Sequence, residues 1–333
     1  MSEPESLPTF ADVEAAARRI QPHAYETPLI ENATLNERLG GRVFLKLESL
    51  QRTGSFKFRG AYNRIALIPP AERQRGVIAF SSGNHAQGVA AAARLFGIAA
   101  TIVMPQDSPR TKLEGTRAQG ANIVFYDRLR DDREAIAARV LAERGGTLIR
   151  PFDDPGIVAG QGTIGLELVA QARAKGCDAL DAVLVPCSGG GVVSGIALAL
   201  SGASPGTAAI SVEPENFDGM GRSLVAGKRT SAPGGALSMA DALMAPMPGA
   251  VPFALAQRHI PFGLWVEERE LARAVAYAAT TLKLIIEPGG LAGLAALLAG
   301  KYDVHGKIVA AVLTGGNCDF DTVANCVSQC SDP

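Results

Sequence analysis

Short apolar runs alternate with longer segments of helical periodicity along most of this chain. In the first half, apolar runs at 77–80, 100–104 and 122–126 are each followed by a helical pattern, at 86–96, 110–119 and 133–143. In the second half, apolar runs at 182–186 and 208–212 flank a helical pattern at 192–201, and a last apolar run lies at 307–313. Strands that alternate with helices at short spacing are typical of parallel sheets covered by helices. The pattern therefore predicts an α/β protein with parallel-rich sheets.

Turn-forming segments interrupt this alternation. Residues 150–155 carry two prolines and two aspartates and form a turn-rich joint, after which a helix is expected at 163–174. The stretch 216–252 is rich in loop-forming residues, and long irregular stretches in compact domains are usually functional or mobile. Further helices are expected at 268–282 and 291–298. With 333 residues, the chain is long enough for about two domains of roughly 150 residues each.

The composition is that of a well-buried globular protein with little net charge. Hydrophobic residues make up 47% and charged residues 20% of the chain, and the formal net charge is -1. No lysine- or arginine-rich run occurs, so nothing indicates a nucleic-acid or anionic-membrane partner. The first ten residues do not resemble a secretory signal, and no apolar segment is long enough to span a membrane. The odd number of cysteines, five, is typical of reduced thiols, so a cytoplasmic location is expected.

The segment Ser55–Gly60, S-F-K-F-R-G, places a lysine between two phenylalanines. Aromatic neighbours that exclude water from an ammonium group lower its pKa and free the amine to act as nucleophile or base. The alternative is a surface lysine whose stem lies along the rings while its charge stays in water. Lys57 is the first candidate for a catalytic residue.

Three polar turns follow predicted strands: S-S-G-N-H at 81–85, S-G-G-G at 188–191 and T-G-G-N at 314–317. The glycine loop precedes a predicted helix, so its backbone N–H groups suit a phosphate. Gly189, Gly191 and Gly195 also permit a dinucleotide-binding interpretation, with Glu213 as the ribose-binding acid. The turn at 81–85 suits a carboxylate or a polar ring substituent, or else it caps the next helix. Because the carboxyl ends of parallel strands meet at one edge, the turns are expected to converge on one ligand site.

The lysine segment and the three turns, in this order and spacing, resemble the signature set of fold-type II pyridoxal-phosphate enzymes. Within that class they resemble the serine/threonine dehydratase and serine racemase family, which includes 3-hydroxyaspartate dehydratases. The similarity runs from about Thr27 to Asp319. It implies a two-domain α/β fold like that of the tryptophan synthase β subunit. Residues 1–51 and 148–333 would form a large cofactor-binding domain, and residues 52–147 an inserted small domain that carries the Ser/Gly/Asn turn.

The resemblance also implies roles for residues around pyridoxal 5′-phosphate. Lys57 would hold the cofactor as a Schiff base and remove the substrate's α-proton, and Ser82 would act on the opposite face. The cofactor-binding set would comprise Phe56, Lys57, Asn84, Ser188, Gly189, Gly190, Gly191 and Thr314. The substrate-binding set would comprise Ser81, Ser82, Gly83, Asn84, His85 and Arg133. Because the neutral hydroxyl of Thr314 would face the pyridine nitrogen, the ring would be a mild electron sink, which suits elimination.

The activity that the resemblance implies is removal of water from a 3-hydroxy amino acid, giving a 2-oxo acid and ammonia. The candidate substrates are L-serine, L-threonine and 3-hydroxyaspartate. Arg133 matches an arginine near a second substrate carboxylate in racemase-like relatives, which would favour 3-hydroxyaspartate because guanidinium pairs bidentately with carboxylate. A solvated arginine at a helix start is the alternative.

Other activities stay open at this point. The loop 241–246 lacks the D-G form of typical threonine dehydratases, which would also allow a dehydratase-like enzyme of hydroxyectoine breakdown. Racemisation of serine or aspartate through Lys57 and Ser82 is a second alternative. A nicotinamide oxidoreductase and a non-catalytic binding protein are the others.

The racemase-like branch carries a cation site from which this chain departs. Glu213 and the backbone carbonyl of Phe217 match, but Gly219 replaces the acidic residue and Asp218 stands one place early. Hard cations prefer several oxygen ligands, so Mg²⁺ or another cation is expected either to be absent or to use Asp218. Glu287, which opens E-P-G-G, is expected to line the site or to be an ordinary surface glutamate. The resemblance also implies a homodimer.

Overall fold

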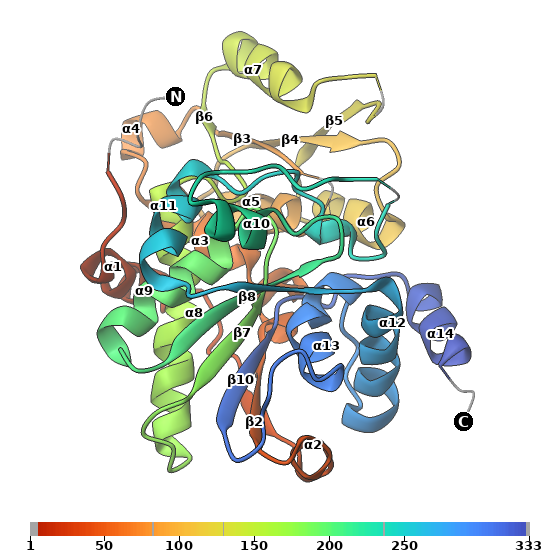
Figure 1. Ribbon diagram of the computed structural model, residues 1–333. Helices are drawn as coiled ribbons and strands as arrows, with labels where there is room; N and C mark the ends of the chain where they lie inside the picture. Colours follow the sequence, from red (N-terminus) through yellow and green to blue (C-terminus); the bar gives the residue numbers. More distant parts are fainter. Residues whose placement is uncertain (1–5, 82, 129, 236, 331–333) are drawn as a thin grey trace.

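The computed structural model describes residues 6–81, 83–128, 130–235 and 237–330. Its larger sheet has six strands in the order β1-β2-β10-β7-β8-β9 (Figure 1). They are β1 (Leu29–Glu31), β2 (Arg42–Leu47), β7 (Ala182–Pro186), β8 (Ala208–Pro214), β9 (Gly263–Val266) and β10 (Ile308–Leu313). β1 pairs with β2 in antiparallel fashion, and each of the other neighbouring pairs is parallel.

The smaller sheet has four parallel strands in the order β5-β4-β3-β6. They are β3 (Val77–Phe80), β4 (Ala100–Pro105), β5 (Asn122–Tyr126) and β6 (Thr147–Leu148). Their helices are α3 (Lys57–Ala66), α5 (Asn84–Leu95), α6 (Arg110–Ala118) and α7 (Arg133–Arg144). Successive side chains of β3 point to opposite faces: Ile78 and Phe80 pack with α7, whereas Val77 and Ala79 pack with α3 and α5. Helices therefore cover both faces of this sheet (Figure 1).

Of the other helices, the short α4 lies beside the smaller sheet, and most of the rest lie around the larger sheet (Figure 1). These other helices are α1 (Phe10–Ile20), α2 (Ala33–Leu39), α4 (Pro70–Arg73), α8 (Pro155–Ala174), α9 (Gly191–Ala203), α10 (Gly219–Ala226), α11 (Ala250–His259), α12 (Glu268–Tyr277), α13 (Ala292–Leu298) and α14 (Phe320–Gln329). Short 3₁₀ turns are η1 (Glu48–Leu50), η2 (Arg52–Gly54), η3 (Asp241–Leu243) and η5 (Pro288–Leu291), and η4 (Ala278–Leu282) is a π-helical turn.

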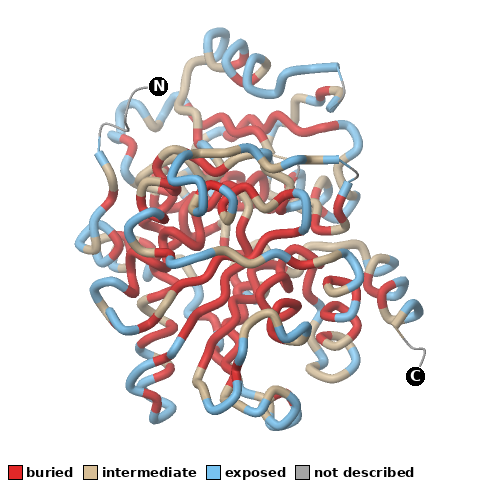
Figure 2. Tube along the Cα trace, in the orientation of Figure 1, coloured by how far each residue is buried: buried red, intermediate tan, exposed pale blue. Residues whose placement is uncertain are grey.

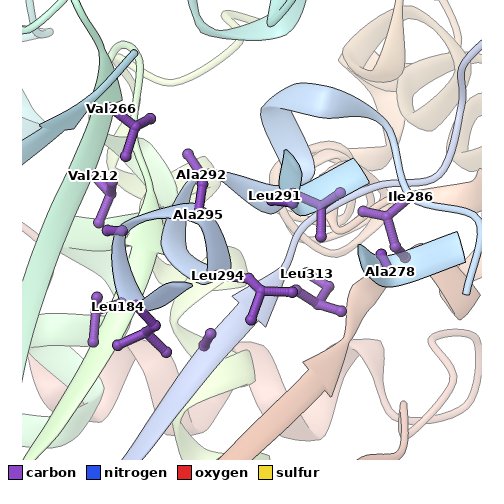
Figure 3. Packing of buried hydrophobic residues seen from close by; sticks show 14 of the residues in the cluster. Leu184, Val212, Val266, Ala278, Ile286, Leu291, Ala292, Leu294, Ala295 and Leu313 are labelled. Atoms are coloured by element: carbon purple, nitrogen blue, oxygen red, sulfur yellow. The ribbon is translucent and has the colours of Figure 1, made fainter. Parts of the chain in front are cut away.

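The larger sheet is also buried on both faces. On one face, Leu294 of α13 packs among Leu184 of β7 and Leu313 of β10 (Figure 3). On the other, Val183 of β7 packs against α8 and α9 through residues such as Ile196. The central strands β2, β10, β7 and β8 are accordingly almost wholly buried, whereas the edge strands β1 and β9 are partly exposed (Figure 2). The predicted α/β class with parallel-rich sheets covered by helices is confirmed.

Several element boundaries differ from those expected. Helix α8 begins at Pro155, capped by Asp154, rather than at 163. Its first turns contain glycines, which lower helix propensity but permit close packing: a Cβ at Gly160 would lie 2.7 Å from the Cα of Gly60. Helix α14 was not expected, and α10 lies inside the stretch expected to be irregular. The helix expected at 268–282 ends as α-helix at Tyr277 and continues as the π-helical turn.

A buried ion-pair network joins α3 to β2, η1 and α8. The guanidinium of Arg59 is fully buried and donates from Nε and Nη2 to Glu48, at 2.8 Å each. It also contacts both carboxylate oxygens of Glu167, which is paired in addition with the buried Lys46 at 2.7 Å. The network fixes the helix that begins at Lys57.

Within the described ranges, no helix is long and apolar enough to cross a bilayer. The strands of the smaller sheet all lie between residues 77 and 148. The division into domains at 52–147 and the flanking segments stays a prediction.

Candidate active site

One cavity lies where strands of both sheets end, and segments far apart in the sequence meet there. Phe80 ends β3, Pro186 ends β7, and Thr314 follows β10, and all three line it. The candidate residues in its wall are Phe56, Lys57, Ser81, Gly83, Asn84, His85, Arg133, Ser188, Gly189, Gly190, Gly191 and Thr314. Ser82 lies outside the described residues. The candidate lysine and the three turns therefore share one cavity, while their individual roles stay predictions.

Lys57 is the first residue of α3, and its ammonium lies in the cavity wall. Its Nζ donates to the carbonyl of Pro151 at 2.8 Å and lies 5.1 Å from the centre of the Phe56 ring. Burial lowers the pKa of Lys57 from 10.5 to about 8, against the opposing charge of Glu287. At neutral pH an appreciable fraction of this amine is uncharged, as a nucleophile or base requires.

The second phenylalanine of the lysine segment does not wall the amine, which corrects the expectation of a lysine held between two rings. Phe58 is fully buried in the core of the smaller sheet and packs against Tyr62, with ring centres 5.7 Å apart. Because α3 begins at Lys57, residues 57 and 58 already follow the helical turn and point in different directions. Desolvation of the amine comes from the cavity itself and from Phe56.

The glycine loop between β7 and α9 forms a cradle for an anion. Gly190 has a φ of +91°, and a Cβ at Gly189 would lie only 2.3 Å from the ring of Phe152. Helix α9 starts at Gly191, and no side chain caps its first N–H groups. Free N–H groups and the positive end of the helix dipole suit a phosphate. The hydroxyl of Ser188 does not cap this helix but accepts the N–H of Ala245 at 3.1 Å, which joins the glycine loop to the segment after η3.

Asn84 and His85 are the first two residues of α5 rather than part of a turn. The amide of Asn84 donates to Glu287 and accepts from Asn317 at 2.9 Å, so its orientation is fixed on both sides. His85 places Nε2 3.0 Å from the carbonyl of Ile149. Burial lowers the pKa of His85 to about 3, so the ring is neutral and Nε2 is the donor. Ser81 accepts the N–H of Gly83 at 3.1 Å.

Thr314 joins the lysine segment to the larger sheet. Its carbonyl accepts the N–H of Phe56 at 3.1 Å, and a β-bridge links Ser55 with Gly315. Thr314 lines the same cavity as the glycine loop and Lys57. A ring held between the loop and the lysine would therefore share its cavity with Thr314.

Three charged residues that the sequence did not reveal, Lys112, Asp241 and Arg128, also line the cavity. Lys112 of α6 contacts both carboxylate oxygens of Asp241 at 2.8 Å and Oε2 of Glu287 at 3.1 Å. Glu287 is buried, which excludes the ordinary surface glutamate. Burial raises the pKa of Glu287, although the Lys112 ammonium opposes the shift. Arg128, which is exposed, lines the cavity as well.

Arg133 is exposed but lines the cavity from the start of α7. Its guanidinium lies 5.3 Å from the centre of the Phe80 ring. Arg128 lines the same cavity and pairs with Asp107 at 3.1 Å. Two exposed arginines, one after β5 and one at the start of α7, therefore line the cavity.

The residues considered for a cation are not arranged to hold one. The two carboxylate oxygens of Glu213 accept the N–H groups of Met220 and Gly221, each at 2.9 Å. Asp218 pairs with Arg222 at 2.7 Å. No group of three or more His, Cys, Asp or Glu side chains suited to a metal occurs among the residues described. The donor set does not fit a cation.

Comparisons with known proteins agree with this site. The family model of the pyridoxal-phosphate dependent enzymes matches residues 20–315. The chain belongs to this family. It is 39% identical over 328 residues to L-threo-3-hydroxyaspartate ammonia-lyase of Saccharomyces cerevisiae, covering 98% of each chain. It is also 39% identical over 321 residues to L-threonine ammonia-lyase of Thermotoga maritima, covering 96% of this chain and 78% of that protein. The structure of maize serine racemase superposes with a TM-score of 0.90 at 32% identity, covering 97% and 98% of the two chains.

Membership of this family and the match to maize serine racemase confirm the expected fold-type II architecture and the expected cofactor, pyridoxal phosphate. Every described candidate cofactor residue from Phe56 to Thr314 lies in the one cavity. The cradle of Gly189 and the uncapped N-terminus of α9 fit the phosphate, and Lys57 fits the aldehyde-binding amine.

Proposed function

We propose that the protein is a pyridoxal-phosphate-dependent ammonia-lyase that removes water from a 3-hydroxy amino acid, giving a 2-oxo acid and ammonia. The observation that carries the proposal is the amine of Lys57, whose pKa is lowered to about 8, in one cavity with an uncapped helix N-terminus that suits a phosphate. Relatives named as ammonia-lyases of threonine and of hydroxyaspartate support it.

Some residues of the chain would hold the cofactor, and others would transfer protons to and from the substrate. When bound, the cofactor supplies an electron sink conjugated with the substrate's α-carbon. Gly189, Gly190 and Gly191 would hold its phosphate through backbone N–H groups. Nζ of Lys57 would remove the α-proton, and the β-hydroxyl would leave with a proton as water. Proton donation to a poor leaving group typically contributes about 10²–10⁴-fold to such a step. The released enamine would then become an imine, which takes up one water and hydrolyses to the 2-oxo acid and ammonia.

We propose that 3-hydroxyaspartate is the preferred substrate. The support is positional: Arg133 and Arg128 line the cavity, where a second carboxylate would gain a bidentate partner. Threonine has a methyl group at that position and gains nothing from a guanidinium.

Ammonia release from the 3-hydroxyaspartate stereoisomers, L-threonine and L-serine tests both steps of the proposal. Arg133→Ala should lower kcat/KM for 3-hydroxyaspartate about 10- to 100-fold and leave the other substrates nearly unchanged. Arg130→Ala is the matched control, because Arg130 is exposed and does not line the cavity. Equal effects on hydroxyaspartate and threonine would remove the distal-carboxylate role. Chiral analysis of the unreacted substrate in the same assay separates elimination from racemisation.

We propose a homodimer whose contact includes Leu50, Ile285 and Phe320, which are exposed by 55%, 47% and 72%. A Cβ at Gly316 would lie 3.0 Å from the carbonyl of Ile285 and 3.3 Å from Ser49, so these segments adjoin. Light scattering should give twice the chain mass of 34.6 kDa, and Leu50→Glu should shift it toward the monomer. A wild-type monomer at micromolar concentration would contradict the dimer.

We also propose a cytoplasmic enzyme that works without a bound cation. Its five cysteines are all free, which suits a reducing compartment. The oxygens of Glu213 are occupied by backbone N–H groups, which takes the place of a cation contact.

A further inference from the structure

A buried lysine bridges the two sides of the cavity. Lys112 belongs to α6 of the smaller sheet, whereas Asp241 lies in η3 and Glu287 directly before η5, on the side of the larger sheet. The side chain of Lys112 is 3% exposed and that of Glu287 also 3%. Burial acts to lower the pKa of Lys112, but Glu287 and Asp241 together raise it, so its charge is retained. Burying a charged lysine costs free energy unless partner charges compensate it, as Glu287 and Asp241 do here.

The stem of Lys112 also lies across the start of α5. A Cβ at Gly83 would be 2.4 Å from Cδ of Lys112, so the aliphatic chain lies directly on this glycine. The next residue, Asn84, contacts the same carboxylate that the ammonium of Lys112 reaches. The stem of Lys112 thus contacts Gly83, and its ammonium pairs with Asp241 and Glu287 on the opposite wall of the cavity.

The carboxylate of Glu287 determines how the amide of Asn84 is turned. Asn84 donates one amide hydrogen to Glu287, and its oxygen accepts from Asn317. A flipped amide would set oxygen against the carboxylate and nitrogen against nitrogen, so the observed orientation is the favourable one. The second amide hydrogen of Asn84 then stays available on the side of the cavity that Asn84 lines.

We propose that Lys112 is a positioning residue: its ammonium pairs with Glu287, Glu287 orients the Asn84 amide, and the bridge to Asp241 holds the 83–85 segment against the opposite wall. The inference rests on the proposed function for its kinetic consequences. Its structural part applies to any ligand in the cavity that meets the Asn84 amide.

The direction of the pH effect follows from the groups around Glu287. These are Lys112 of α6, Asp241 of η3, Lys57 of α3, and the thiol of Cys318 after β10. Burial and the Asp241 charge raise the pKa of Glu287, and Lys112 opposes them. Without the ammonium, Glu287 takes up a proton at higher pH, and the neutral carboxyl accepts the Asn84 amide hydrogen more weakly than the carboxylate does.

The test compares Lys112→Met, Lys112→Arg and the control Lys228→Met, which changes an exposed lysine away from the cavity. Each protein is loaded with pyridoxal phosphate, and the absorbance of the bound cofactor is titrated with pH in the absence of substrate. Lys112→Met should move the acid-side transition upward by about one pH unit or more, and Lys112→Arg should restore most of the wild-type position. In the kinetic assay, the acid limb of kcat/KM should move the same way, with a loss of about tenfold at pH 7.

Glu287→Gln is the second arm, because it keeps the acceptor for Asn84 but cannot titrate. Its acid-side transition should be absent or lie below that of wild type, opposite to Lys112→Met. Coincident transitions in wild type, Lys112→Met and the control would overturn the positioning role, and so would Glu287→Gln and Lys112→Met moving in the same direction. Absence of ammonia release by wild type would overturn the proposed activity but not the absorbance result, so the two failures are distinguishable.

Discussion

The lowered pKa of Lys57 predicts how fast the empty enzyme captures its cofactor at each pH. Only the uncharged amine attacks the aldehyde of pyridoxal phosphate. With a pKa of about 8, roughly one amine in ten is uncharged at pH 7. For an amine with the ordinary value of 10.5, the fraction would be roughly three in ten thousand, about 300-fold smaller. The rate of capture should therefore rise nearly tenfold per unit at low pH and level off above about pH 8.

Two variants separate the causes of this shift. Glu287→Gln removes the charge that raises the pKa of Lys57, so its plateau should begin at lower pH than in wild type. Phe56→Ala admits water beside Nζ, which lies 5.1 Å from that ring, so its plateau should begin at higher pH.

Stopped-flow absorbance of apoenzyme mixed with pyridoxal phosphate between pH 6 and pH 10 measures the rate. Lys57→Ala is the control and should show no covalent capture. A wild-type rate that keeps rising tenfold per unit up to pH 10 would refute a desolvated Lys57. A Glu287→Gln plateau at higher pH than wild type would refute the assigned direction of its charge effect.

Three further predictions concern stability, cofactor affinity and metal dependence. Arg59→Met leaves two carboxylates without their buried partner and should lower the free energy of unfolding by about 3–5 kcal/mol in urea titrations; a loss below about 1 kcal/mol would contradict the network. Gly189→Ala places a Cβ 2.3 Å from the Phe152 ring and should weaken cofactor binding about tenfold or more, whereas Gly206→Ala, which meets nothing within 4 Å, should not. Unchanged affinity in the Gly189 variant would remove the loop from the phosphate site. Exhaustive chelation followed by Mg²⁺ should change neither the melting temperature nor turnover; restoration of activity by Mg²⁺ would show a cation site.

Sequence patterns predicted the structural features that depend on residues close together in the chain. The apolar runs at 77–80 and 182–186 became β3 and β7 because alternation with helices is encoded locally. The convergence of the three turns followed from the rule that parallel strands end at one edge, and the place of Lys57 beside them followed from the family resemblance.

The missed features depend on distant residues. Lys112 meets Asp241 across 129 positions, and no local pattern marks either residue as a partner of the other. The start of α8 was missed because its first turns contain glycines, which disfavour a helix locally. These glycines permit close packing against α3, as at Gly160. Phe58 was expected to lie beside the lysine amine. Because α3 begins at Lys57, the side chain of Phe58 points into the core instead.

The central claim is that Lys57 drives water elimination from a 3-hydroxy amino acid. The most direct measurement is parallel quantification of ammonia and 2-oxo acid formed from 3-hydroxyaspartate by cofactor-loaded wild type and by Lys57→Ala, each checked for folding by circular dichroism. Wild type should form ammonia and 2-oxo acid in equal amounts, and the folded variant should form neither. Equal product formation by Lys57→Ala, or no product from wild type with any 3-hydroxy amino acid, would contradict the central claim.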